Sequence, residues 1–136
     1  VSTVSAAEIL AGPAAATLRG AGACVGRILP LNTVKIVAPA DSALPSLAAA
    51  RELPPGEIGE IIVTGPTVTE AYDDLPEATA AAKIPGPDGA VWHRMGDLGY
   101  LDQEGRLWFV GRKAETVPAA QGPLHPARVE PLFDLH

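Results

Sequence analysis

The sequence has a single cysteine, Cys24, which excludes an internal disulfide and is typical of a protein from a reducing compartment. It has no apolar run near the roughly 20 residues that cross a bilayer. Residues 1–10 also lack the charged and then apolar pattern of a signal peptide. Together these absences predict a cytoplasmic protein with no transmembrane segment.

Basic residues are few, since 10 Lys and Arg stand against 16 Asp and Glu and give a net charge of -6. Nucleic acids bind to clustered basic side chains, and no such cluster is present, so nucleic acid is not expected as a partner. Three histidines, His93, His125 and His136, are scattered with no Cys or acid at ligand spacing, so no metal site is predicted. Cys24 has only Arg27 as a basic neighbour and is interpreted as a small hydrophobic residue.

Motifs of nucleophilic and phosphate chemistry are absent as well. No serine lies in a Gly-x-Ser-x-Gly turn, and no Gly-rich phosphate loop ends in Gly-Lys-Ser or Gly-Lys-Thr. The sequence therefore predicts neither a serine hydrolase of this type nor a nucleotide site built on such a loop.

Large apolar residues are scarce for a chain that is 47% hydrophobic. Ala buries little surface and accounts for 24 residues, whereas Leu, Ile, Val and Phe together make up a quarter of the chain. This composition lies above the disordered range but predicts a thin core. The thin core, the missing initial Met and the abrupt ends lead us to expect a fragment of a larger protein. An exposed apolar face would then let the fragment self-associate.

Gly and Pro, with 14 residues each, interrupt the chain and limit the length of helices. A capping box formed by Ser5 and Glu8 predicts one short helix. Asp74 as the cap, with Pro76 in the first turn, predicts a second helix that continues to Lys83. Alternating or β-branched runs predict strands at residues 34–37, 60–64, 91–94, 98–102 and 106–112.

This order of elements predicts a mainly β protein of the α+β class, a small distorted β-barrel subdomain with two short helices. An α+β meander fits the same pattern. Residues 14–22 are interpreted as a loop or a frayed helix, and residues 41–55 as a surface loop. From residue 113 onward the chain is expected to be irregular.

Two dipeptides, Gly96-Asp97 and Gly111-Arg112, lie at the open end of a predicted hairpin whose turn is residues 102–105. Because an antiparallel hairpin brings its open ends together, Asp97 and Arg112 should be neighbours. One interpretation is a turn glycine beside a surface salt bridge. The other is a carboxylate that accepts from the vicinal hydroxyls of a ribose, beside a guanidinium that holds sugar and phosphate. Phe109 is predicted to be a core residue that could also face a ligand.

Three blocks of sequence resemble core motifs of the adenylate-forming enzymes, which include acyl-CoA synthetases, luciferases and the adenylation domains of peptide synthetases. The blocks are GEIIVTGP at residues 59–66 with Ala71-Tyr72 and PEAT at 76–79, WHRMGDLGY at 92–100, and LWFVGR at 107–112. Their order, spacing and residue types match across residues 26–112, about two thirds of the chain.

The resemblance implies that Asp97 binds the ribose hydroxyls of ATP and that Arg112 contacts ribose and phosphate, with Phe109 as a further nucleotide-binding candidate. It also implies three parts. Residues 1–25 would be the tail of the preceding subdomain, and residues 26–112 the β-barrel subdomain of the AMP-binding domain. Residues 113–136 would form a hinge, at Lys113 and Ala114, and the start of the C-terminal domain, whose first element is expected at residues 126–130. The catalytic residues and the ligands of the Mg²⁺ that accompanies ATP are expected outside this fragment, which is predicted to be inactive alone.

Three departures from the family pattern point to one branch of it. Met95 stands where the family has Thr, Ala114 where it has a hinge acid, and Pro118 where it has Lys. HRMGD at residues 93–97 and GRKA at 111–114, which contain the first two departures, are together with GPLH at 122–125 similar to the β-lactone synthetases of bacterial long-chain olefin biosynthesis. Those enzymes adenylate a β-hydroxy acid and close it to a β-lactone without coenzyme A.

We therefore expect a fragment of such a synthetase, with ATP and a fatty or β-hydroxy acid as substrates and the rest of the same enzyme chain as its partner. A long-chain fatty acid–CoA ligase is the alternative within the family. A non-catalytic β-module that binds another protein is the alternative from a different class.

Overall fold

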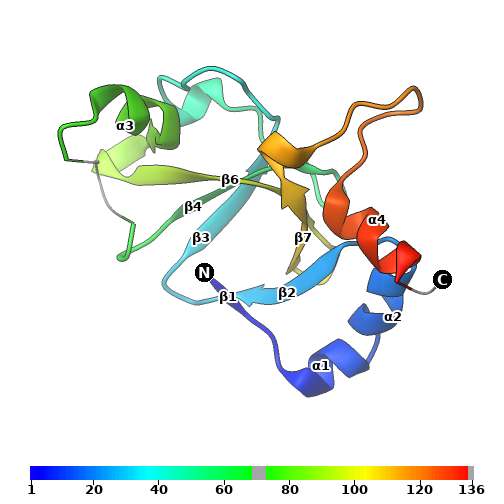
Figure 1. Cartoon of the computed structure of the whole chain (residues 1–136). Helices are drawn as coiled ribbons and strands as arrows, with labels where there is room; N and C mark the ends of the chain where they lie inside the picture. The colour runs from blue at the N-terminus through cyan, green and yellow to red at the C-terminus, as the bar shows by residue number, and fades with distance from the viewer. Residues whose placement is uncertain (69–72, 135–136) are drawn as a thin grey trace.

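A computed structural model describes residues 1–68 and 73–134, and its main feature is one curled antiparallel sheet (Figure 1). Within the described residues the sheet has seven strands in the order β1-β2-β7-β6-β4-β3, with β5 paired to β6. The strands are β1 (Ser2–Thr3), β2 (Ala23–Ile28), β3 (Thr33–Val37), β4 (Gly59–Thr64), β5 (Lys83–Pro85), β6 (Val91–Leu101) and β7 (Arg106–Arg112). The predicted mainly β class with a small, distorted barrel is confirmed.

Strand β6 is the centre of the sheet, because it pairs with β4, β5 and β7. The sequence predicted two strands here, at residues 91–94 and 98–102, and that prediction was wrong, since β6 is one strand of 11 residues. Gly96 has a φ of 73° inside the strand. Glycine adopts this conformation without steric cost, so the chain bends at Gly96 without leaving the sheet.

The turn that joins β6 to β7 is confirmed at residues 102–105, and Gly105 has the positive φ, 75°, that was expected there. Asp102 holds this turn with both carboxylate oxygens. Its Oδ1 accepts from the backbone N–H groups of Glu104 and Arg106, each at 2.9 Å. Its Oδ2 accepts from Arg106 Nε at 2.7 Å and from Trp108 Nε1 at 2.9 Å.

Short helices lie around the sheet (Figure 1). Helix α1 (Ala6–Leu10) begins with the predicted capping box, in which Ser5 Oγ accepts from Glu8 N and Glu8 Oε2 accepts from Ser5 N. Helix α2 (Pro13–Leu18) occupies most of the stretch that was interpreted as a loop or a frayed helix. Helix α4 (Pro126–Phe133) packs against β7 and α2, and it includes residues 126–130, where the first element past the hinge was expected. The sequence thus predicted two helices, whereas the described residues contain four α-helices.

Helix α3 (Pro76–Ala82) is present but starts differently from the prediction. Its N-cap is Leu75, with no hydrogen bond from a capping side chain, and Asp74 lies one residue earlier with a φ of 53°. In that left-handed conformation the Asp74 carboxylate does not cap the helix. Lys83, which was predicted to end the helix, is the first residue of β5. The motif residues Ala71 and Tyr72 lie outside the described residues.

The core consists of two small clusters on the sheet. The first contains Val37, Ile62, Ile84 and Trp92, and the second contains Ile36, Ile61 and Leu107. Residues 41–55, which were expected to be a surface loop, cover the first cluster, because Leu44, Leu47 and Ala50 pack against it. This segment contains the 3₁₀ helix η1 (Leu47–Ala49), while η2 (Pro87–Gly89) precedes β6 and η3 (Lys113–Glu115) follows β7.

Cys24 is buried in β2, as expected of a small hydrophobic residue. Strand β2 includes residues on both sides of position 25, and β1 belongs to the same sheet. The division into residues 1–25, 26–112 and 113–136 stays a prediction. Among the described residues no helix is long and apolar enough to cross a membrane.

Candidate functional site

Asp97 and Arg112 face each other across the β6–β7 pair, as the hairpin geometry predicted. They are direct partners in the strand register, and Arg112 Nη1 donates to Asp97 Oδ1 at 2.8 Å. The Asp97 side chain is 16% exposed and the Arg112 side chain 59% exposed. The hydrogen bond with Asp97 and the charge of that carboxylate raise the pKa of Arg112 above its ordinary value. The guanidinium therefore stays charged at the mouth of the site.

The carboxylate of Asp97 has one oxygen left for a ligand. Its Oδ1 is bound to Arg112, whereas Oδ2 accepts no hydrogen bond from any residue that the structure describes. A partly exposed carboxylate oxygen beside a fixed guanidinium can accept from a hydroxyl, and the remaining N–H groups of Arg112 can serve further oxygens of the same ligand. This donor and acceptor set fits a sugar hydroxyl next to a phosphate.

Phe109 lies in β7, three positions before Arg112 and opposite Gly99 of β6. Its side chain is half-buried, so it is neither a fully enclosed core residue nor a free surface one. Within the described part of the chain no ring contact or side-chain hydrogen bond joins Phe109 to the Asp97–Arg112 pair. Its role as a nucleotide-binding residue stays a prediction.

The predicted hinge residues, Lys113 and Ala114, form the first part of η3 directly after Arg112. Ala114 is exposed. Lys113 turns back over the sheet, where its Nζ donates to the carbonyl oxygen of Ala40. The same Nζ lies 3.5 Å from Asp41 Oδ1 and 3.8 Å from Glu60 Oε2.

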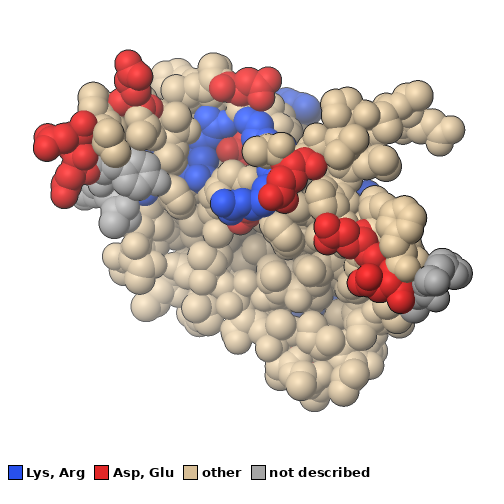
Figure 2. All heavy atoms as spheres, viewed as in Figure 1, with Lys and Arg blue, Asp and Glu red and all other residues tan. Residues whose placement is uncertain are grey.

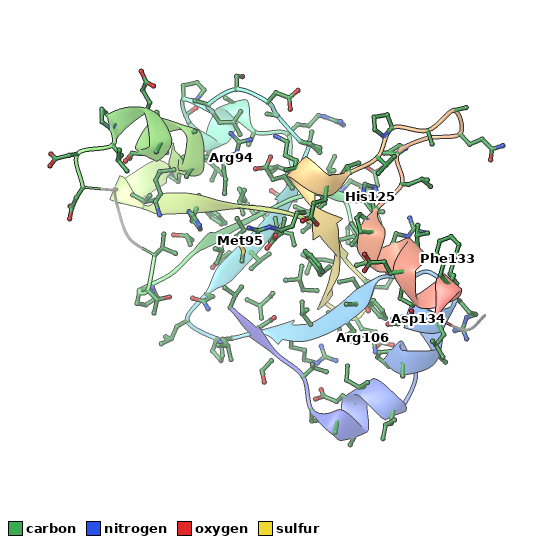
Figure 3. The ribbon with its side chains drawn as sticks, in the orientation of Figure 1. Arg94, Met95, Arg106, His125, Phe133 and Asp134 are labelled. Carbon is green, nitrogen blue, oxygen red and sulfur yellow. The ribbon has the colours of Figure 1, made fainter. Side chains whose placement is uncertain are left out.

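A buried ion pair between Glu60 of β4 and Arg94 of β6 lies under Lys113. Arg94 Nε donates to Glu60 Oε1 at 2.8 Å, and Arg94 Nη2 donates to Glu60 Oε2 at 2.9 Å. The Glu60 side chain is 2% exposed and the Arg94 side chain 7%. The bond to Glu60 outweighs the effect of burial and raises the pKa of Arg94. Figure 3 shows Arg94 directed toward α3, whereas Met95, the next residue of β6, points to the other side of the strand.

Sequence reasoning assigned no role to Glu60 or Arg94, although it quoted both residues within motifs. The available signal was the presence of a charge inside a predicted core strand, because a fully buried Glu or Arg is rare unless it is paired. Figure 2 shows one face of the molecule, on which basic and acidic atoms lie next to one another in the region of β6 and the start of η3.

Lys83 and His93 form a second polar contact, 3.2 Å apart between Nζ and Nδ1. Burial lowers the pKa of Lys83, and burial together with the nearby Lys83 charge lowers the pKa of His93. Lys83 borders an open apolar cavity of about 730 Å³ between α3, β5 and residues 43–45. Among the described residues, no hydrogen bond joins the Lys83–His93 contact to Asp97 or Arg112.

His125 lies before α4 at the edge of a cavity of about 520 Å³ that Lys113 and Arg128 also line. It is 7% exposed, and its Nδ1 has no hydrogen-bond partner among the described residues. Burial and the charge of Arg128 lower its pKa. That the histidines bind no metal ion stays a prediction. Among the described residues no group of three or more His, Cys, Asp or Glu could hold one.

Comparison with known proteins gives a consistent set of relatives, although no family model matches the chain. It is 52% identical over 124 residues to an olefin beta-lactone synthetase from Stenotrophomonas maltophilia, covering 88% of this chain and 22% of that protein. The corresponding protein of Xanthomonas campestris is 50% identical over 125 residues, or 89% of this chain and 22% of that protein. A 2-succinylbenzoate–CoA ligase from Geobacillus kaustophilus is 40% identical over 82 residues, which is 60% of this chain and 16% of the ligase.

Comparison with solved structures gives similar enzymes. ATP-bound MatB from Rhodopseudomonas palustris superposes with a TM-score of 0.68 at 30% identity, over 83% of this chain and 20% of that one. The O-succinylbenzoate coenzyme A synthetase of Bacillus subtilis, in complex with ATP and a magnesium ion, has a TM-score of 0.59 at 31% identity, over 76% of this chain and 19% of that one. The chain thus spans about a fifth of the length of the proteins that it matches.

Proposed function

Because the chain belongs to the adenylate-forming enzymes and matches one segment of them, we propose that it supplies the ribose-binding part of an ATP-dependent enzyme that converts a long-chain β-hydroxy acid to a β-lactone. The observation that carries this proposal is the Asp97–Arg112 pair, which leaves one carboxylate oxygen and several guanidinium N–H groups for a ligand. The β-lactone product is taken from the two synthetases that are 52% and 50% identical to the chain.

The proposed reaction has two steps. In the first, a carboxylate oxygen of the acid attacks the α-phosphorus of ATP, and the bond to pyrophosphate breaks. In the second, the β-hydroxyl oxygen attacks the acyl carbon and releases its proton to solvent as AMP leaves. Asp97 and Arg112 take no part in bond making, because their role is to hold the ribose so that the α-phosphate keeps one position relative to the acid.

Cofactor binding is proposed on the same basis. ATP fits the site, since Asp97 Oδ2 can accept from a ribose hydroxyl while Arg112 faces the phosphate side. Mg²⁺ would neutralise charge on the triphosphate, and its ligands are proposed to lie outside the described residues, which offer no suitable cluster. A cytoplasmic location stays a prediction that the single, buried Cys24 supports.

Replacement of Asp97 tests the ribose role. In the full-length enzyme we expect Asp97→Ala to raise the KM for ATP about tenfold to a hundredfold, the effect of losing a charge-assisted hydrogen bond of about 1.5–3 kcal/mol. Steady-state pyrophosphate release at varied ATP would measure this change. Asp134→Ala is the matched control, because Asp134 is an exposed carboxylate at the end of α4 (Figure 3). A folded Asp97→Ala enzyme with an unchanged KM for ATP would rule out the ribose role.

A CoA ligase is the second candidate, and the 40% identity to a 2-succinylbenzoate–CoA ligase is the observation that favours it. The two candidates share the adenylation step and differ in what attacks the acyl carbon, a β-hydroxyl or a thiol. A non-catalytic β-module, the alternative from another class, predicts no loss of function when Asp97 is replaced, so the same variant separates it from both enzymes.

A further inference from the structure

Lys113 makes a set of contacts that the nucleotide-binding role of Asp97 and Arg112 does not explain. Its ammonium group donates to Ala40 O and lies within 4 Å of both Asp41 and Glu60. The side chain is 26% exposed, although it follows directly on Arg112, whose side chain is 59% exposed. A lysine on an exposed 3₁₀ turn would ordinarily extend into solvent, so this orientation is specific.

Two of the groups that Lys113 contacts, Ala40 O and the Glu60 carboxylate, also accept hydrogen bonds from Arg94. Arg94 Nη2 donates to Ala40 O at 2.5 Å, so Ala40 O is shared between Arg94 and Lys113. Arg94 Nη1 donates to Ser42 O at 2.9 Å and to Ala81 O at 3.2 Å, and the remaining bonds go to Glu60. All five N–H groups of this guanidinium are thus used. Of the acceptors near Lys113, Glu60 is buried and bonded to Arg94, Ala40 O is shared with Arg94, and the Asp41 side chain is exposed.

Two cross-links therefore tie consecutive residues of one chain segment to the body of the sheet. Arg112 is joined to Asp97 on β6, and Lys113 is joined to Ala40 and Glu60 above Arg94, which lies three residues before Asp97 on the same strand. The Arg112 side chain is 59% exposed, whereas the Lys113 side chain is 26% exposed and one of its contacts is the buried Glu60. The second cross-link restricts the backbone that carries the first.

We propose that Lys113 is a positioning residue, which holds the main chain at residues 112–113 so that the Arg112 guanidinium stays against Asp97 and is preorganised for the ribose and phosphate of ATP. This inference rests on the proposed function. Preorganisation of this kind reduces the ordering cost of binding, and its loss therefore weakens nucleotide binding without removing any group that touches the nucleotide.

The test compares three variants of the full-length enzyme, Lys113→Met, Lys113→Arg and Lys35→Met, by steady-state kinetics at varied ATP and by thermal unfolding. Lys113→Met keeps the length of the side chain and leaves every Arg94–Glu60 bond in place, so the protein is expected to fold. Lys35→Met is the matched control, because Lys35 pairs with Glu52 at 2.7 Å on another strand of the same sheet.

For Lys113→Met we expect the KM for ATP to rise about tenfold, the fold-change that the loss of one charge-assisted hydrogen bond supports, with a much smaller change in kcat. Lys113→Arg should restore most of the affinity, since a guanidinium can donate to the same carbonyl. Lys35→Met should leave the KM for ATP unchanged. A merely structural role of Lys113 would instead lower the unfolding temperature and kcat without a selective effect on KM.

A double variant separates this inference from the proposed function. If Lys113 acts through Asp97 and Arg112, then Asp97→Ala with Lys113→Met should have a KM for ATP close to that of Asp97→Ala alone. A normal KM in Lys113→Met beside an impaired Asp97→Ala would overturn the positioning role and leave the proposed function standing. A normal KM in Asp97→Ala would overturn both.

Discussion

At the scale of single residues, the Glu60–Arg94 pair connects the sheet to the loop and the helix beside it. Arg94 bonds to Glu60 in β4, to two carbonyls of residues 40–42 and to Ala81 in α3, so one side chain joins three segments. A buried ion pair of this kind is worth little against an apolar pair of equal volume, but either partner alone is costly. Its bonding pattern nevertheless specifies where these segments meet.

The first prediction concerns the asymmetry of this pair. Arg94→Met leaves the Glu60 carboxylate buried and without its partner, and we expect it to lower the free energy of unfolding by about 3–5 kcal/mol. The double variant Glu60→Leu with Arg94→Met removes both charges and should lose less than Arg94→Met alone. Urea unfolding followed by tryptophan fluorescence measures both. A double variant that is less stable than the single one would show that the ion pair itself, rather than its completeness, stabilises the fold.

The same residues show where reasoning from the sequence ended. Asp97 and Arg112 were placed together correctly, because the turn at residues 102–105 defines a local hairpin with both residues at its open end. A register shift at Leu98 and Gly99, which the sequence did not predict, makes Arg112 the direct partner of Asp97. Glu60 and Arg94 are 34 positions apart, and their contact depends on the pairing of β4 with β6. Charge alone does not show which acid a buried arginine meets, so this part of the site required the three-dimensional structure.

At the scale of elements, the errors of prediction share a cause. Gly96 was taken as a break between two strands, yet it bends one strand, because β6 pairs with β4 on both sides of it. Strand β5 has three residues and was missed, since its hydrophobic pattern is too short to recognise and only pairing with β6 defines it. Helix α4 includes residues 126–130, where the first element past the hinge was expected, but its two prolines left the residue pattern without a helix prediction.

The second prediction concerns the β6–β7 turn and its dependence on pH. Burial raises the pKa of Asp102, but hydrogen bonds from Trp108, Arg106 and Glu104 lower it by more, so the net pKa is below its ordinary value. A carboxylate with a lowered pKa contributes stability that is fully present above the pKa of the unfolded chain, about 3.9. This contribution is lost as the pH falls through the lower pKa of the folded state.

The measurement compares the unfolding free energies of the wild type and Asp102→Asn between pH 6 and pH 2.5. At pH 6 the variant should be less stable by about 1.5–3 kcal/mol, the value of hydrogen bonds to a charged group. The difference should shrink below about pH 4 as Asp102 of the wild type takes up a proton. A difference that does not vary with pH would mean that the Asp102 carboxylate holds the turn by shape and not by charge.

At the scale of the whole molecule, the third prediction concerns what the full-length enzyme does with its adenylate. Ala114 occupies the exposed position after Lys113 where the family resemblance leads one to expect an acid, so the segment after Arg112 lacks that polar group. With a plain fatty acid, ATP and coenzyme A, we expect little acyl-CoA, and with a β-hydroxy acid we expect AMP and a β-lactone. Chromatography of both reactions distinguishes the products, and strong thioester formation would favour the CoA ligase.

The last prediction concerns the 136-residue chain by itself, which we expect to be catalytically silent. Adenylation requires preorganised cations around the triphosphate, because negative charge develops at the α-phosphate. The chain has three lysines, and each makes a structural contact: Lys35 with Glu52, Lys83 with His93, and Lys113 with Ala40. Among the described residues, the candidate for the nucleotide is then the Asp97–Arg112 pair, at its ribose end.

A ribose contact alone supports millimolar binding at most, about -4 kcal/mol. We therefore expect no acid-dependent release of pyrophosphate from the purified chain, and nucleotide binding that is detectable only at millimolar concentrations by titration calorimetry. Exposed apolar side chains, including Leu10, Leu31 and Phe133, predict in addition that the chain self-associates, which sedimentation would show. Arg112→Ala is the control for any residual activity, because a contaminating enzyme would be indifferent to it. Pyrophosphate release that Arg112→Ala abolishes would mean that the described residues already contain the catalytic machinery, and the assignment of that machinery to the rest of a longer enzyme would then be wrong.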